Sequence, residues 1–572
     1  MRRILSIVLA LSLLGAARTG EPWAQQQPAM GAHAMVATAQ HYATKVGVDV
    51  LRGGGNAIDA AVAVGYALAV VHPCCGNIGG GGFMLVRLHD GRERFIDFRE
   101  TAPRRARSNM YLDAHGNVVA RASTRGYLSA GVPGTVMGLD RALSEFGTRS
   151  RAAMIAPAAA LAQNGYRIDP GDASVFDGAD DAAEGPYRFS AQPNVRAIFM
   201  RAGRLPQAGD LIVQPQLAAT LRLIARDGDQ AFYKGPIAHA VVAASERNGG
   251  ILSLADFAGY RVRETQPLHC RYRGYTITSA PPPSSGGTTL CEILNVTSGY
   301  PLGSWGWNSR ESAHYVVEAE RRAYADRNEY LGDPSFVQNP LTQLLSQTYA
   351  AHVRSQIDPR QATPSVDVHP GLGPVAFEHT DTTHYSIVDR WGNAVAVTYT
   401  INDDFGARVI AGNTGFLLND EMDDFTSKPG VPNLYGLVQG VRNGIQPGKR
   451  PLSSMAPTIV TRNGKVFMVT GSPGGSRIIT IALSTIENAI DYGMNVQQAV
   501  NAPRIHMQWL PDAIEYEPGA LSPQTIAALR SEGYRFRERA QWGTAEAVVV
   551  DAAGVRYGGT DRRAPQGLAA GY

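Results

Sequence analysis

Cysteine is scarce in this chain. Only four cysteines occur among 572 residues, and none belongs to a Cys-x-x-Cys pair. The sequence also has no His-Glu-x-x-His motif, so the common signatures of a zinc site are absent. We therefore expect neither a metal ion nor a cofactor.

An excess of charge of one sign is missing as well. The chain carries 53 basic and 50 acidic residues, and its net charge of +3 is spread over the whole length. Without a basic stripe, the composition argues against nucleic acid as a ligand, and any attraction of an anionic substrate must be local.

The N-terminus lacks an apolar run long enough to span a bilayer comfortably. Two arginines precede the apolar stretch Ile4 to Leu14, and small residues follow. This pattern is typical of a secretory signal peptide cleaved after Ala17 or after Ala24. The sequence thus predicts a signal peptide over residues 1–24 and a periplasmic or secreted protein without a stable membrane anchor.

Export bears on the cysteines, because an oxidising compartment permits disulfides. Cys74 and Cys75 are adjacent, while Cys270 and Cys291 lie further along the chain. This spacing leaves the pairing open, although adjacent cysteines rarely bond each other. We expect a structural role for all four.

The composition is globular, with 44% hydrophobic and 18% charged residues. At 61.2 kDa the chain exceeds what one hydrophobic core usually holds. Two domains, or one large two-part assembly, are therefore expected.

Helical patterns dominate up to about residue 360. A helix after Thr38 ends at the glycine triplet 53–55, and a buried helix follows over 57–71. A glycine-dense loop, 76–82, then precedes a strand over 83–88. The clearest later helices are predicted over 152–164, 214–226 and 312–330.

After Gly371 the pattern changes to strands and turns, so we place a boundary there. Strands are predicted over 383–388, 394–400, 457–461 and 466–470, and Asn463-Gly464 indicates a tight hairpin between the last two. An amphipathic helix over 476–492 and a hairpin over 545–557 follow. These elements predict sheets covered by a helix.

Thr382 lies where the helical part gives way to the sheet part, directly before a predicted strand. A threonine hydroxyl is a poor nucleophile alone, but cleavage of the chain just before it would create an α-amino group able to act as its base. Such an amine has a pKa of about 8, which suits that task near neutral pH. The alternative is an ordinary threonine pair that opens a strand.

A glycine-rich turn, Gly471 to Arg477, joins a predicted strand to a predicted helix. Backbone amides at a helix N-terminus can stabilise negative charge, as an oxyanion hole requires. Neither the P-loop nor the dinucleotide-binding glycine pattern fits the turn. An ordinary strand-to-helix turn remains the alternative.

A third set of residues is suited to holding an amino acid. A guanidinium such as that of Arg99 binds a carboxylate through two parallel hydrogen bonds. Hydroxyls at Ser453 and Ser454 could assist, and the carboxylates of Glu421 and Asp424 suit an ammonium group. Taken singly, such residues are more often solvated surface charges or helix caps than ligand-binding groups.

Together these residues match a known family: the chain resembles the bacterial γ-glutamyltranspeptidases, members of the N-terminal-nucleophile hydrolases. The resemblance extends over nearly everything after the signal peptide. The matching segments are 53–61, His72-Pro73, 76–84, 97–100, 281–287, 324–327, 382–386, 450–455 and 471–477.

The resemblance implies an α+β fold, a four-layer αββα sandwich built from both halves of a self-cleaved chain. Cleavage between Asp381 and Thr382 would give a large subunit, 25–381, mostly helical but contributing to the sheet core, and a small, strand-rich catalytic subunit, 382–572. The two would form a heterodimer.

Roles for single residues follow from the same resemblance. Thr382 would be the nucleophile, Thr400 its hydroxyl partner, and Gly474 and Gly475 the oxyanion-hole donors. The α-carboxylate of a glutamyl group would be held by Arg99, Ser453 and Ser454. Its α-ammonium would be held by Asn402, Glu421 and Asp424. Tyr435 resembles the tip of the family's lid loop, which suggests a gated pocket.

Three features depart from the family pattern. Asp403 and Asp404 stand where relatives often have uncharged residues, which would make the rim of the site negative and affect the choice of acceptor. Cys74-Cys75 is unexpected beside the glycine loop. Glu421 is a carboxylate where some members have an amide, which should strengthen its grip on an ammonium.

The implied activity is transfer of the γ-glutamyl group of glutathione, or of another γ-glutamyl compound, to water or to an amino acid or dipeptide. Two alternatives are a glutaryl-cephalosporin acylase of the same fold and an unprocessed periplasmic amino-acid-binding protein. Glu421 and Asp424 argue against the acylase, because a glutaryl group has no ammonium.

Overall fold

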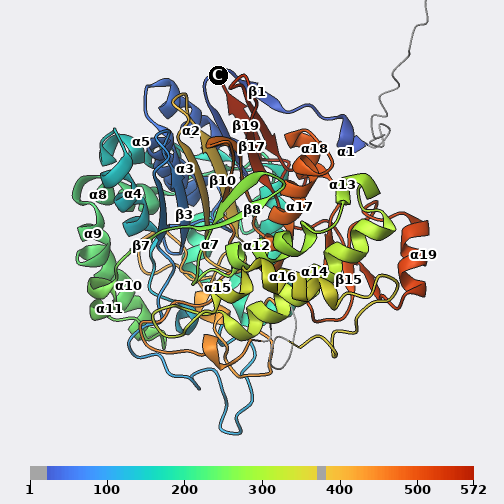
Figure 1. Cartoon of the computed structure of the whole chain (residues 1–572). Coiled ribbons are helices and arrows are strands. Elements are labelled where there is room, and N and C mark those ends of the chain that lie inside the picture. Colours follow the sequence, from blue (N-terminus) through green and yellow to red (C-terminus); the bar gives the residue numbers. More distant parts are fainter. Residues whose placement is uncertain (1–21, 370–381, 438) are drawn as a thin grey trace, which may run out of the picture.

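A computed structural model of the 572-residue chain describes residues 22–369, 382–437 and 439–572 (Figure 1). The predicted signal peptide, apart from its last three residues, and Asp381 lie outside the described residues. Among the residues that the structure describes, no helix has the length and hydropathy needed to cross a membrane.

Two antiparallel seven-stranded sheets form the centre of the fold. The first has the order β1 (Ala29–Gly31), β18 (Arg556–Thr560), β17 (Glu546–Val550), β13 (Lys465–Gly471), β12 (Thr458–Arg462), β9 (Tyr275–Ser279) and β8 (Leu268–Tyr272). The second has the order β19 (Leu568–Gly571), β2 (Met35–Thr38), β10 (Thr383–Val388), β11 (Ala394–Thr400), β3 (Gly81–Arg87), β4 (Glu93–Asp97) and β7 (Arg263–Thr265).

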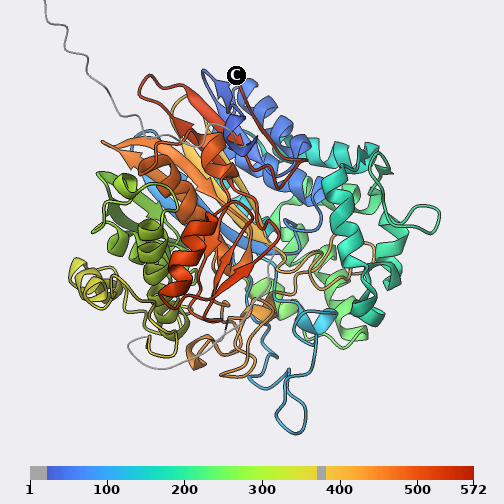
Figure 2. The same ribbon diagram turned by 90° about the vertical axis from the view of Figure 1, so that its right-hand side faces the viewer.

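Helices cover the outer face of each sheet (Figures 1 and 2). On the second sheet lie α2 (His41–Arg52), α3 (Ala57–Val71) and α4 (Thr135–Phe146). On the first sheet lie α12 (Gly286–Thr297) and α17 (Ile478–Ile490). Small apolar side chains, among them Ala37, Ala396 and Val469, fill the space between the sheets. The predicted four-layer αββα sandwich is confirmed.

Further elements surround this sandwich. The remaining helices are α1 (Pro22–Gln25), α5 (Arg151–Asn164), α6 (Pro170–Ala179), α7 (Pro193–Phe199), α8 (Pro215–Asp227), α9 (Asp229–Tyr233), α10 (Pro236–Arg247), α11 (Leu254–Gly259), α13 (Leu302–Trp305), α14 (Arg310–Tyr330), α15 (Leu341–Leu344), α16 (Gln347–Ser355), α18 (Val496–Asn501) and α19 (Pro523–Ser531). Two small sheets hold β14 (Ile505–His506), β15 (Ile514–Tyr516) and β16 (Phe536–Glu538), and β5 (Tyr166–Arg167) with β6 (Leu211–Ile212).

Local sequence explains why α3 forms where it does. The Asn56 side chain caps its N-terminus, and the Asp59 carboxylate accepts a hydrogen bond from the Asn56 amide, which completes a capping box. Every residue of the helix is buried, as its small and apolar side chains predict. The helix ends at Val71, and His72 leads into the loop that carries Cys74, Cys75 and the glycines.

Each of the two large sheets contains strands that precede residues 370–381 in the sequence and strands that follow them. In the second sheet, β10 and β11 follow this segment, yet β10 pairs with β2 and β11 pairs with β3, which both precede it. The change of pattern after Gly371 therefore does not separate two independent sheets. The short strands β8 and β9 also lie in the stretch predicted to be mainly helical, and they pair as a hairpin.

All four cysteines are paired. Cys270 on β8 bonds Cys291 on α12, which ties a sheet edge to the helix above it. Cys74 bonds its neighbour Cys75. This pairing was the less expected one, because bonds between adjacent cysteines are rare.

Candidate active site

Thr382 lies at the open end of the strand pair β10 and β11. The last register pair is Thr383 with Tyr399, and one step further along the two chains come Thr382 and Thr400. Both threonines are buried, Thr382 to 6% exposure. The Thr400 hydroxyl oxygen accepts a hydrogen bond from the Asn402 amide at 2.7 Å. This bond uses only the oxygen, so the hydroxyl proton of Thr400 can be donated to another group. The geometry suits a hydroxyl partner for Thr382.

Most of the predicted site residues line one small cavity, the inner pocket. Its own side chains nearly fill it, leaving about 20 Å³. The lining residues are Arg99, Arg327, Thr382, Thr400, Asn402, Glu421, Asp424, Tyr435, Leu437, Ser453, Ser454, Met455, Gly475 and Ile478. Of the predicted residues, Gly474 does not line this pocket, although it precedes Gly475, and Asp381 lies outside the described residues.

Arg99 is the central charge of the inner pocket. Its guanidinium is fully buried and donates to the carboxylates of Glu421 and Asp424. Burial raises the pKa of both carboxyl groups, and the Arg99 charge opposes that shift. The groups predicted to hold opposite ends of an amino acid therefore pair with each other here. The pocket thus places a positive charge directly beside two negative ones.

Glu100 lies behind this ion pair. Its carboxylate is buried, with one oxygen 3.7 Å from a terminal nitrogen of Arg99. Burial raises the pKa of Glu100 to about 7, although the Arg99 charge opposes the shift. The group is thus placed to change its charge near neutral pH.

A pH dependence of stability follows from this placement. Up to about pH 7 the folded chain holds a proton that the unfolded chain releases near pH 4.5. Between these values the folded state binds more protons, so the free energy of unfolding falls as pH rises, by up to about 1.4 kcal/mol per pH unit. We expect Glu100→Gln to remove this contribution. In urea unfolding, the free energy of unfolding of the variant should therefore increase relative to that of the wild type as pH rises through that window. A difference that stays constant with pH would contradict the assignment.

Ser453 and Ser454 sit in a loop held by the motif at 281–287. The Ser453 carbonyl accepts hydrogen bonds from the amide and hydroxyl of Ser285, at 2.7 and 2.6 Å. Gly286 packs so closely that an added Cβ would lie 2.3 Å from the Met455 carbonyl oxygen. The motif therefore serves to fix the serine loop against the pocket.

Arg327 is a pocket residue to which the sequence assigned no role. It lies on α14 and donates to the hydroxyls of Ser285 and Ser454, each at 2.8 Å. It also donates to Asn328 at 2.8 Å, but in the described part of the chain no carboxylate lies within ion-pair distance of it. Burial lowers its pKa to about 10. The only signal in the sequence was its place in the motif at 324–327.

Gly474 and Gly475 form the turn before α17. Their φ angles are 139° and 53°, in the region that residues with a Cβ rarely adopt. The one-turn 3-10 helix Gly475–Arg477 then leads into α17. The turn brings backbone amides to the edge of the inner pocket at the N-terminal end of a helix, which suits an oxyanion hole.

Tyr435 closes one side of the inner pocket. Its ring is buried, and its hydroxyl donates to the side-chain oxygen of Asn402. The Asn433 side chain accepts from the amides of Tyr435 and Leu437 at 3.0 and 3.1 Å, which shapes the loop. The loop predicted to be a lid thus covers the pocket in this structure.

Thr382 also lines a second, larger space, the outer cavity. It measures about 480 Å³, and its lining includes His72, Cys75, Thr382, Asp404, Pro473 and Arg563. Of the two unexpected acids, only Asp404 lines it. Asp403 accepts a hydrogen bond from Arg125 at 2.6 Å, and both acids line a separate surface depression. Thr382 therefore lies at the junction of the two spaces.

Comparison with known proteins identifies the family to which the chain belongs. The family model for gamma-glutamyltranspeptidase matches residues 43–571. The chain belongs to the γ-glutamyltranspeptidase family. A glutathione hydrolase proenzyme of Pseudomonas sp. (strain A14) is 53% identical over 96% of each chain. That of Escherichia coli (strain K12) is 47% identical over 95% of this chain and 93% of its own.

Among solved structures, a cephalosporin acylase from Bacillus halodurans superposes with a TM-score of 0.85 at 27% identity, covering 98% of this chain and 99% of its own. Membership of the γ-glutamyltranspeptidase family thus agrees with the N-terminal-nucleophile hydrolase fold, which the acylase shares.

Proposed function

We propose that this chain is a self-cleaving γ-glutamyltransferase and glutathione hydrolase in which Thr382 is the nucleophile. The observation that carries the proposal is the place of Thr382 between two spaces. On one side lies the inner pocket, in which Arg99 pairs with the carboxylates of Glu421 and Asp424. On the other side lies the outer cavity, which is large enough for a peptide amine.

The reaction follows from this placement. Thr382 Oγ attacks the γ-carbonyl carbon while its own α-amino group accepts the hydroxyl proton. Amides of the Gly474-Gly475 turn stabilise the negative charge on the carbonyl oxygen. The amine then leaves with that proton, which leaves a glutamyl ester on Thr382. Water, or the amine of an amino acid or dipeptide, attacks the ester next.

Specificity for γ-glutamyl groups follows from charge balance. A bound α-carboxylate can take the place of Glu421 and Asp424 at Arg99, while the α-ammonium takes the place of Arg99 at those carboxylates. The bound amino-acid group adds one charge of each sign, so the charge balance of the pocket does not change and every buried ion keeps a partner of opposite charge. A glutaryl group brings only a carboxylate and would leave the two acidic side chains without a cation.

Two measurements test the proposal. On a denaturing gel the purified protein should run as two fragments, and N-terminal sequencing should show that the smaller begins at Thr382. The enzyme should then hydrolyse a γ-glutamyl anilide at least about 100-fold faster, in kcat/KM, than a glutaryl anilide, a difference of about 3 kcal/mol. The reverse preference would support the acylase, and a single uncut band would support a binding protein.

Export supports the same proposal, because a chain with the predicted signal peptide would meet extracellular γ-glutamyl peptides. Cleavage at Asp381–Thr382 would leave subunits 25–381 and 382–572 joined through both sheets, since each sheet contains strands from both sides. The subunits should therefore stay together after cleavage, and they should separate only under denaturing conditions.

Arg327 has a positioning role within this proposal. Because its guanidinium donates to the Ser454 oxygen, the Ser454 proton points elsewhere, toward a substrate carboxylate in the pocket. We expect Arg327→Lys to lower kcat/KM for a γ-glutamyl anilide by about 10- to 100-fold, the size of one hydrogen bond to a charged group.

The loss should depend on the substrate's α-carboxylate. A 4-aminobutyryl anilide, which lacks that group, should lose much less, so discrimination between the two substrates should fall. Arg322→Lys is the matched control, since Arg322 lies on the same helix and pairs with Glu318 outside the pocket. Equal losses on both substrates would reduce Arg327 to a structural role.

A further inference from the structure

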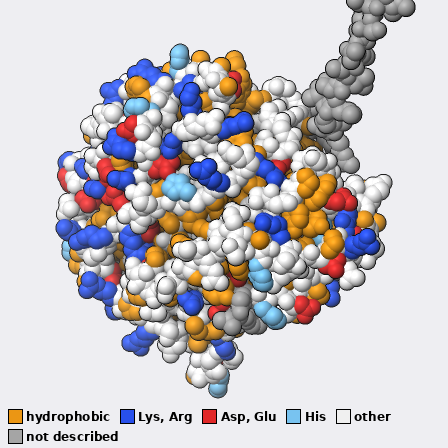
Figure 3. Space-filling model, in the orientation of Figure 1, with side chains coloured by type: hydrophobic (Ala, Val, Ile, Leu, Met, Phe, Trp, Pro, Cys, Tyr) orange, Lys and Arg blue, Asp and Glu red, His pale blue; other side chains and the backbone are white. Residues whose placement is uncertain are grey.

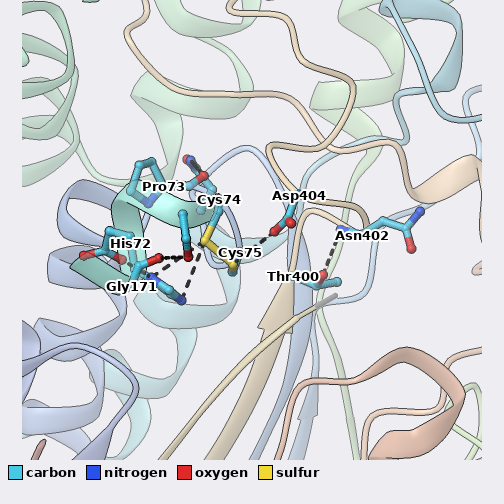
Figure 4. Close-up of a disulfide and its surroundings, with 11 residues drawn as sticks. His72, Pro73, Cys74, Cys75, Gly171, Thr400, Asn402 and Asp404 are labelled. Carbon is cyan, nitrogen blue, oxygen red and sulfur yellow. Dashed lines mark hydrogen bonds and ion pairs between the residues drawn. A yellow bond between two sulfur atoms is a disulfide. The ribbon is translucent and has the colours of Figure 1, made fainter. Parts of the chain in front are cut away.

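The Cys74–Cys75 disulfide lies between His72 and Asp404 (Figure 4), and its Cys75 half lines the outer cavity. Cys75 and Thr382 both line this cavity. Gly76 follows Cys75 directly and packs on Thr383, so closely that an added Cβ would lie 2.5 Å from the threonine methyl carbon. The disulfide is thus fixed beside the strand that presents the nucleophile.

The two sulfur atoms have different surroundings. Cys74 Sγ lies 3.7 Å from both ring nitrogens of His72, and His72 Nδ1 lies 3.2 Å from an oxygen of Asp172. Cys75 Sγ lies 3.7 Å from an oxygen of Asp404. A protonated His72 would stabilise a thiolate on Cys74, whereas Asp404 would oppose one on Cys75.

This asymmetry gives thiol–disulfide exchange a direction. In such an exchange most of the negative charge lies on the incoming and departing sulfurs, and less on the sulfur under attack. Cys75, which lines the cavity, is placed to be attacked, and Cys74, which is not among the lining residues, is placed to depart beside His72. Asp404 then faces the sulfur that carries the least charge.

The proposed reaction brings a thiol to this wall, and this step rests on the proposed function. The inner pocket takes the glutamyl part of the donor, so the amine part must extend into the outer cavity from Thr382. When the donor is glutathione, that part is cysteinylglycine, whose side chain is a thiol. The outer cavity is therefore where a cysteinyl thiol is both bound and released.

We propose that the Cys74–Cys75 disulfide is an exchange site for the cysteinyl thiol of the donor and of the released peptide. The thiolate attacks Cys75 Sγ, the bond between Cys74 and Cys75 breaks, and Cys74 departs with the electron pair and takes a proton from His72. The product is a mixed disulfide on Cys75. Cys74 can reverse the step, or a second thiol can release the peptide as a disulfide and leave both cysteines reduced.

The second disulfide is an internal control in the same molecule. Cys291 is fully buried and Cys270 is partly exposed, but neither lines the outer cavity, because their bond lies between β8 and α12. It should stay intact under conditions that convert Cys74–Cys75. General reduction of the protein would affect both.

The test uses the cleaved, active enzyme and cysteinylglycine as the probe. After incubation, acid quenching and alkylation, peptide mass spectrometry should find cysteinylglycine bound to Cys75, an alkylated Cys74 and an intact Cys270–Cys291 bond. S-methyl-cysteinylglycine should give no adduct. His72→Gln should slow formation of the adduct by at least about tenfold, because the departing thiolate loses its proton donor.

An active enzyme that forms no adduct on Cys75, or forms adducts equally on Cys270 or Cys291, would overturn the proposal. An unchanged rate in His72→Gln would overturn the assigned direction, and so would an adduct carried by Cys74. Hydrolysis of a γ-glutamyl anilide by the untreated enzyme reports separately on the proposed function. An inactive preparation would therefore be recognised as failure of that function and not of the exchange site.

Discussion

Replacing Thr382 by alanine should leave the chain uncut and lower hydrolysis of a γ-glutamyl anilide by at least about 10³-fold. One hydroxyl performs both tasks, because in the precursor Thr382 Oγ attacks the carbonyl carbon of the preceding residue, and in the mature enzyme it attacks the donor. Uncut, the chain would also lack the α-amino group that serves as base. A denaturing gel and an anilide assay measure the two effects on one sample.

Thr383 provides the matched control for this experiment. It is the next residue, its hydroxyl is buried, and that hydroxyl is without a hydrogen-bond partner within the described residues. Thr383→Val keeps the shape and removes only this oxygen, so cleavage and activity should persist. Cleavage of Thr382→Ala at the same site, or loss of both activities in Thr383→Val, would contradict the role of Thr382.

Arg99→Lys should produce the second large effect, a fall in kcat/KM for γ-glutamyl substrates of about 10²- to 10³-fold. An ammonium group keeps the charge, so Glu421 and Asp424 still face a cation. It cannot reach both carboxylates, or a substrate carboxylate, with two parallel hydrogen bonds as a guanidinium does. The loss should appear mainly in KM, because the contact is made in the ground state as well.

Arg450→Lys separates this effect from general damage to the core. Arg450 is buried to a similar degree and binds the carboxylate of Asp97, but it does not line the inner pocket. Thermal stability should fall in both variants, whereas only Arg99→Lys should lose discrimination between γ-glutamyl and 4-aminobutyryl anilides. Unchanged turnover of glutathione by Arg99→Lys would refute the assigned contact.

Local elements were predictable because their causes are local. The helix 57–71 and the strands 383–388 and 394–400 match α3, β10 and β11 in the structure. The hairpin at Asn463-Gly464 also forms, with φ angles of 52° and 77° at the two turn residues. Capping, burial pattern and turn chemistry lie within a few residues of each other, so the sequence displays them directly.

Other features depended on contacts between distant segments. The strands β8 and β9 carry no long apolar run, and their pairing within a sheet was hidden in a stretch of helical pattern. The role of the motif at 281–287 as a support for Ser453 and Ser454 appears only when the two loops are side by side. Asp403 was likewise predicted at the rim of the site, whereas in the structure its carboxylate accepts a hydrogen bond from Arg125.

The sequence by itself determined which chemical groups this protein has, where its local elements begin and end, and which family motifs it carries. Only the tertiary structure decided which charges meet. Arg99 and Glu421 are bonded although 322 positions separate them. Arg327 enters the pocket without an ion pair to a carboxylate among the described residues, and the bonded Cys74–Cys75 pair places Cys75 in the lining of the cavity that Thr382 also lines. Coulombic and hydrogen-bond energies depend on distance in space, which chain position does not reveal when the partners lie on different strands, helices and loops.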